Sequence, residues 1–75
     1  MITLVDTLVI DSGSYSVKFL KGSFVKKDFV VEEADEVLIE DVRGQDSDLA
    51  IESIQQIIIK QYLEDSKFSG KIINQ

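Results

Sequence analysis

The chain has 75 residues, enough for one small domain that buries roughly 60% of its extended surface. Its 8 basic and 14 acidic residues leave a net charge of -6, which argues against nucleic acid or an anionic membrane as a direct partner. It contains neither histidine nor cysteine, which excludes disulfides, thiolate metal sites and every mechanism built on Ser-His or Cys-His pairs.

The first predicted element is a strand over residues 3–10. Its core, Leu8-Val9-Ile10, is continuously apolar, which is typical of a central strand covered on both faces. No apolar run is long enough to cross a bilayer, and the amino terminus lacks the basic region and apolar core of a signal peptide. We therefore expect a cytoplasmic protein in which any link to a membrane is indirect.

A short polar turn follows this strand. Gly13 permits backbone angles that are closed to other residues. Successive N–H groups in such a turn form a concave nest that binds anions. Ser12, Ser14 and Ser16 add hydroxyl donors around it. These features predict a loop that holds an anion.

Two charged residues flank this loop. Lys18 supplies a compact positive charge for phosphate oxygens. Asp11 suits Mg²⁺, which takes one or two carboxylates and shares phosphate oxygens. The pattern therefore predicts a magnesium-nucleotide site. The alternative is an ordinary hairpin connection, in which Asp11 bonds its own backbone and Lys18 stays solvated.

A second strand is predicted over residues 17–21. Gly22-Ser23 then predicts a tight turn into a third strand over residues 24–32. In the third strand the apolar residues Val25, Phe29 and Val31 partly alternate with charged ones. Together, the three strands should form an antiparallel meander.

The segment 32–41 holds six of the 14 acidic residues around an apolar Val37-Leu38-Ile39. It either continues the third strand or forms a short edge strand. Its carboxylates lack the spacing of a metal-binding loop, so we expect them in a solvated connection and assign no site there.

An amphipathic helix follows, with Asp46-Ser47-Asp48 as its N-cap and acidic first turn. Helical spacing predicts one apolar stripe against the sheet, made of Ala50, Ile51, Ile54, Ile57, Ile58 and Tyr62. Leu49, Ile59 and Leu63 widen that stripe, which indicates that more than one surface covers the helix.

Gly70 marks the end of the helical region, and Lys71-Ile72-Ile73 begins a fourth strand that a right-handed crossover lays parallel to the first. The predicted class is α/β, an antiparallel three-strand meander plus a helix and a parallel fourth strand, like half of a ribonuclease H-like fold. Because the last strand is short and apolar, we expect residues 1–75 to be a single fragment, truncated at its C-terminus, that self-associates.

The pattern Asp-x-Gly-Ser-x-Ser-x-Lys, from Asp11 to Lys18, resembles the first phosphate-binding loop of the superfamily of actin, the heat-shock chaperones and the sugar kinases. Within it, the chain is most similar to the pilus assembly family PilM and its relative FtsA. Those families begin with a short apolar strand, Asp-Ile-Gly-Ser, a hydroxyl residue and a lysine. The resemblance is sharp over residues 9–20. Ser12 departs from it, because these families usually have an apolar residue there.

The resemblance implies ATP and Mg²⁺ as cofactors. It implies that Asp11 faces the metal, that Gly13 and Ser14 give backbone contacts to phosphate, and that Lys18 reaches the phosphates. It also implies that Tyr15 and Ser16 close the loop. No catalytic residue is assigned. The expected cofactor-binding residues are Asp11, Ser12, Gly13, Ser14, Tyr15, Ser16 and Lys18, with Asp11 as the metal ligand.

The family implies the first subdomain of an actin-like ATP-binding protein. Its role would be a cytoplasmic scaffold in the assembly of a type IV pilus or a related secretion system, with a PilN-like inner-membrane protein as partner. A cell-division role like that of FtsA is the alternative. The chain lacks a second phosphate loop and an adenosine-binding segment, so we expect no ATP hydrolysis by these 75 residues.

Two other classes of function stay open. One is a non-catalytic interaction module that retains the loop as a relic. The other is a ribonuclease H-like nuclease, in which Asp11 would be one of several metal-binding carboxylates. Lys18 and the acidic surface argue against the nuclease, because an enzyme that acts on DNA needs a basic surface.

Overall fold

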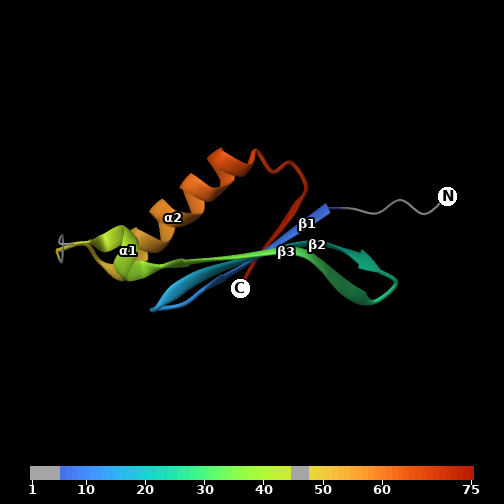
Figure 1. Ribbon diagram of the computed structural model, residues 1–75, viewed down its shortest axis with the longest axis horizontal. Coiled ribbons are helices and arrows are strands. Elements are labelled where there is room, and N and C mark those ends of the chain that lie inside the picture. Colours follow the sequence, from blue (N-terminus) through green and yellow to red (C-terminus); the bar gives the residue numbers. More distant parts are fainter. Residues whose placement is uncertain (1–5, 45–47) are drawn as a thin grey trace.

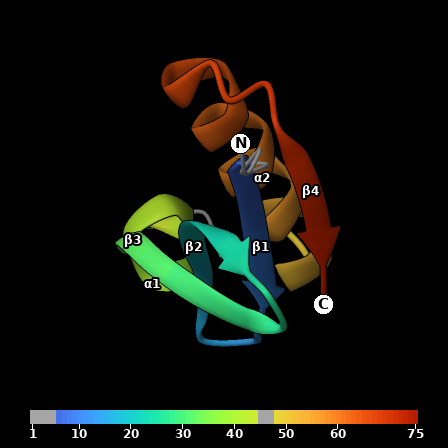
Figure 2. The same cartoon turned by 90° about the vertical axis from the view of Figure 1, so that its right-hand side faces the viewer.

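The computed structural model describes residues 6–44 and 48–75. Its elements are β1 (Asp6–Ser12), β2 (Ser16–Val25), β3 (Asp28–Leu38), α1 (Ile39–Arg43), α2 (Ile51–Ser66) and β4 (Lys71–Asn74). The strands form one sheet in the order β3-β2-β1-β4, in which β4 is parallel to β1 and the other neighbours are antiparallel (Figure 1, Figure 2). The predicted α/β class, the meander and the parallel fourth strand are confirmed.

One face of the sheet carries the core. Side chains alternate along a strand, so Leu8 and Ile10 of β1 share a face with Val17 and Phe19 of β2. Helix α2 lies over that face (Figure 1). The buried cluster consists of Leu8, Ile10, Val17, Phe19, Ile39, Ile54 and Ile58. We call the opposite side, which bears the partly exposed Val9, the open face. In the described part of the chain the helices cover one face of β1, not both as predicted.

The β2–β3 hairpin turns at Lys26-Lys27, not at Gly22-Ser23 as the sequence predicted. Gly22 lies inside β2, beside a β-bulge, and pairs with Val31. A Cβ atom at Gly22 would lie 2.9 Å from the Val30 carbonyl carbon and would overlap the carbonyl oxygen. This glycine therefore permits the close approach of the β2 and β3 backbones inside the sheet, and it does not form the turn.

Residues 32–38 of the acidic segment continue the third strand, which is one of the two predicted alternatives, whereas residues 39–41 belong to a helix that was not predicted. Strand β3 runs to Leu38 and is exposed along most of its length. Helix α1 then follows directly, and its first residue, Ile39, is buried in the core. Within residues 6–44 and 48–75, no three acidic side chains gather into a group that could hold a metal ion.

Both predicted ends of the long helix need correction. Two of the three predicted capping residues, 46 and 47, lie outside the described residues, and the N-cap is Ala50, which makes no side-chain capping bond. The helix ends at Lys67, whose left-handed backbone (φ 52) forms the C-cap, rather than at Gly70. Gly70 instead lies against the Asp6 carbonyl, where a side chain would not fit.

The apolar stripe of α2 is only partly the predicted one. Ile54 and Ile58 are buried, and Tyr62 packs against the core. By contrast, Ile51 is 37% exposed and Ile57 is 47% exposed. The widening residues Ile59 and Leu63 pack against the core as well. The buried stripe is therefore rotated toward Ile59 and Leu63, because one sheet face covers a single side of the helix.

Tyr62 joins α2 to two strands. Its ring stacks on Phe19 with centroids 3.9 Å apart and an angle of 7° between the planes. Its hydroxyl donates a hydrogen bond to Asp35 Oδ2 at 3.3 Å. Burial, and after it the nearby Asp35 carboxylate, raises the pKa of the Tyr62 phenol, because both disfavour the phenolate.

This shift predicts a loss of stability in alkali. The folded state favours the protonated phenol, so Tyr62 contributes to the free energy of unfolding. That contribution is fully present below the usual pKa of about 10 and is lost as pH rises through the higher pKa of the folded state. Tyr62→Phe keeps the stack and removes the ionisation. We expect it to lower the free energy of unfolding by about 0.5 kcal/mol at pH 8.

Urea unfolding of both proteins between pH 8 and pH 11 measures this effect. The advantage of the parent chain over Tyr62→Phe should shrink as pH rises, while the other titrating groups are common to both chains. A pH-independent difference would contradict the proposed environment of Tyr62.

Candidate functional site

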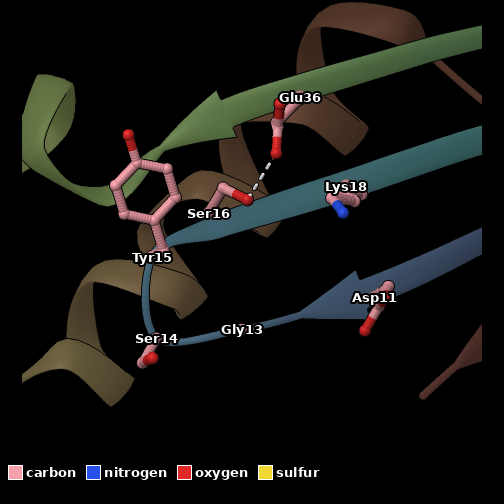
Figure 3. Close-up of a pocket in the computed structure, with 7 residues that line it drawn as sticks. All are labelled: Asp11, Gly13, Ser14, Tyr15, Ser16, Lys18 and Glu36. Carbon is pink, nitrogen blue, oxygen red and sulfur yellow. Dashed lines mark hydrogen bonds between the residues drawn. The ribbon is translucent and has the colours of Figure 1, made fainter.

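Three charged side chains meet on the open face. Asp11 of β1 is directly opposite Lys18 of β2, and Lys18 is directly opposite Glu36 of β3. Residues that are directly opposite in a sheet project from the same face, so all three project away from the core. Figure 3 shows them side by side on neighbouring strands.

These side chains and the β1–β2 loop line a shallow pocket of about 280 Å³. Its lining residues are Asp11, Gly13, Ser14, Tyr15, Ser16, Lys18 and Glu36. Six of the seven predicted site residues are therefore brought together. Ser12 is not among them, because alternation along β1 places it on the same face as Ile10.

Glu36 is the lining residue that sequence reasoning missed. It belongs to the acidic segment, which was expected to be a solvated connection. Only the register of β2 against β3 brings it beside Lys18 and Ser16, which are 18 and 20 positions earlier in the chain. The one available signal was the antiparallel meander, and it does not specify register where a glycine and a bulge interrupt the pairing.

The loop is held by hydrogen bonds from three sides. The Gly13 N–H donates to the Ser16 carbonyl at 2.9 Å, which closes the turn. The Tyr15 carbonyl accepts from the Ile39 N–H at 2.9 Å, and the Gly13 carbonyl accepts from Gln55 Nε2 at 2.7 Å. Backbone contacts to phosphate were expected from Gly13 and Ser14. The Gly13 N–H is used in this turn, so the Ser14 N–H is the one left to contact a phosphate.

The hydroxyl groups of the loop have different surroundings. Ser16 is 7% exposed and its hydroxyl donates to Glu36 Oε2 at 2.7 Å, so its proton is not directed at a ligand (Figure 3). Ser14 is exposed on the pocket. Tyr15 is 68% exposed. Of the three serines predicted as hydroxyl donors, Ser14 is the one that can serve a ligand in the pocket.

The pocket has one cation and two anions. Within the described ranges, no ion pair joins Lys18 to Asp11 or Glu36. A free phosphate would be attracted by Lys18 and repelled by both carboxylates. A bound Mg²⁺ changes that balance, because it can bridge a carboxylate and phosphate oxygens. Asp11 suits such an ion, because its exposed carboxylate supplies the oxygen ligands that Mg²⁺ prefers.

Comparison with known proteins supplies no relative: no protein-family model, curated protein or solved structure matches the chain. None of the helices in the described ranges is both long and apolar enough to span a membrane. What the site can do follows from its own residues.

Proposed function

We propose that the β1–β2 loop binds the phosphate groups of a magnesium nucleotide, as the first phosphate-binding loop of an actin-like ATP-binding domain. The observation that carries this proposal is the pairing of Asp11 with Lys18 beside a glycine turn, on the face of the sheet away from the core. Lys18 would contact phosphate oxygens directly, and Asp11 would hold Mg²⁺ or its waters.

The size of the pocket supports a phosphate ligand rather than a whole nucleotide. Sites that bury a drug-sized ligand usually enclose roughly 300–1,000 Å³. The volume here is about 280 Å³, and the pocket lies open on the sheet surface. We therefore assign the phosphates to these residues and the base and sugar to surfaces beyond them. We expect no ATP turnover by the 75 residues alone.

The wider proposal follows the resemblance. The order β3-β2-β1-β4, with helices α1 and α2 between the third and fourth strands, is compatible with half of a ribonuclease H-like fold. On that basis the chain would be the first subdomain of a PilM-like scaffold protein, located in the cytoplasm and recruited to the inner membrane by a pilus or secretion assembly protein. FtsA-like cell division is the alternative role.

A specific observation favours a second candidate, the non-catalytic interaction module. The Gly13 N–H and the Ser16 hydroxyl are both used in bonds within the protein, so the loop keeps its shape without a ligand. The open face also exposes apolar side chains, including Phe24 at 42% and Val31 at 48%. Under this candidate a partner covers that face and the loop binds no nucleotide.

Loss of the Lys18 charge should weaken phosphate binding. We expect Lys18→Gln to raise the dissociation constant for magnesium pyrophosphate at least fivefold, because a charge-assisted bond contributes about 1.5–3 kcal/mol when it is fully formed. Pyrophosphate is the probe because the pocket holds phosphate groups alone. The measurement is a two-dimensional amide NMR titration of the ¹⁵N-labelled chain, followed at residues 13–16.

The matched control is Lys27→Gln, which removes the same charge at the hairpin turn, at the far end of β2. It should leave the affinity within twofold of the parent chain. Omission of Mg²⁺ should weaken binding to the parent chain. Equal losses in both variants would show nonspecific attraction, and absence of binding to the parent chain would favour the interaction module.

A further inference from the structure

We infer that Gln55 is a positioning residue for the phosphate-binding loop, and that it turns the Gly13–Ser14 peptide so that the Ser14 N–H faces the pocket. This inference rests on the proposed function. Its basis is the 2.7 Å hydrogen bond from Gln55 Nε2 to the Gly13 carbonyl, which joins residues 42 positions apart in the sequence.

The location of Gln55 suits this role. It follows Ile54 on α2, and Ile54 is fully buried against the sheet. Gln55 itself is half-buried, whereas the next residue, Gln56, is exposed. Packing of Ile54 and Ile58 thus holds this side of the helix against the sheet and presents the Gln55 amide to the end of the β1–β2 hairpin.

The orientation of the Gly13–Ser14 peptide sets the direction of the Ser14 N–H. The Gly13–Ser14 peptide bond is trans, and in a trans peptide the C=O and N–H groups point in opposite directions. The Gly13 carbonyl points to Gln55 of α2, on the covered side of the sheet. The N–H of Ser14 belongs to the same peptide and therefore points to the other side. That side is the open face, where Asp11, Lys18 and the pocket lie.

The reversed peptide would be harmful to anion binding. It would direct the partial negative charge of the Gly13 carbonyl at the phosphate and turn the Ser14 N–H away from it. Glycine resists such a reversal less than other residues do, because it has no Cβ atom. The other bonds of the loop use the Gly13 N–H and the Tyr15 carbonyl, which are outside this peptide. Gln55 is therefore the group whose bond selects its orientation.

The test compares Gln55→Leu with Gln56→Leu. Both replace a glutamine on the same helix by a good helix former, and only the first removes the donor to Gly13. We expect Gln55→Leu to raise the dissociation constant for magnesium pyrophosphate about three- to tenfold, the range that one hydrogen bond supports. Gln56→Leu should bind like the parent chain.

A second readout reports on the peptide itself without ligand. Nuclear Overhauser contacts of the Ser14 amide proton should connect it to open-face side chains in the parent chain and in Gln56→Leu. These contacts should weaken in Gln55→Leu, while the amide chemical shifts of the four-stranded sheet stay unchanged. Parent-like contacts in Gln55→Leu, or parent-like affinity, would each overturn the inference.

The two proposals fail in different ways. If the parent chain does not bind magnesium pyrophosphate, the proposed function is wrong, and the Ser14 contacts still decide whether Gln55 orients the peptide. If the parent chain binds and Gln55→Leu binds equally well, the proposed function stands and Gln55 has no positioning role.

Discussion

Gly22→Ala is expected to unfold the β2–β3 hairpin and with it most of the domain. A Cβ atom at position 22 would lie 2.9 Å from the Val30 carbonyl carbon and 3.1 Å from the Val31 Cα atom. These are backbone atoms of the paired strand, so no rotamer change relieves the overlap. Overpacking of this kind costs about 3 kcal/mol, which approaches the whole stability of about 3–5 kcal/mol expected for so small a domain.

The control is Gly44→Ala. Gly44 also has a special conformation, with φ +57, but a Cβ atom there meets nothing within 4 Å. Its ψ of -126 lies outside the left-handed helical region, so backbone strain alone should cost about 1–3 kcal/mol. Circular dichroism and amide NMR dispersion at 25 °C compare the two variants. A Gly22→Ala chain as stable as the parent chain would show that the bulged register of β2 and β3 is wrong.

Phe19→Ala is expected to have the largest effect of any single core substitution. Phe19 is fully buried, it lies among the core residues of β1 and α2, and its ring stacks on Tyr62. Truncation of a buried phenylalanine costs about 3–5 kcal/mol, since the cavity is filled only in part. The variant should therefore be largely unfolded at 25 °C.

Phe24→Ala is the matched control on the same strand. Phe24 is 42% exposed and makes one tilted ring contact with Phe29, at 5.1 Å between centroids. We expect a loss of about 1 kcal/mol, which leaves the chain folded. Urea unfolding followed by circular dichroism gives both values. Similar losses in the two variants would contradict a core centred on Phe19 and α2.

Most of the candidate site followed from local pattern. Asp11, Gly13 and Lys18 were predicted together because they occupy neighbouring positions around one turn, and a two-strand hairpin brings such positions together without long-range information. Ser12 was predicted with them and lies on the other face. The reason is the two-residue period of a strand, which separates even adjacent residues of one motif.

The residues that complete the site come from distant parts of the chain. Glu36 reaches Lys18 through strand pairing, and Gln55 reaches Gly13 through the packing of α2 on the sheet. Neither glutamic acid nor glutamine stands out in its own segment, since one lies in an acidic stretch and the other in an ordinary helix. A pattern confined to one segment carries no information on such contacts.

The amino-acid pattern alone was sufficient for the four strands, the long helix, their order and the parallel return of β4, because hydrophobic periodicity, turn chemistry and crossover handedness act over short stretches. It did not predict the short helix α1. It was not sufficient for the position of the β2–β3 turn, for the single covered face or for the partners of the loop. Those depend on how closely two backbones approach at Gly22 and on which side α2 packs. These features are decided by long-range packing, which depends on whole faces of the sheet and helix rather than on neighbouring residues in the sequence.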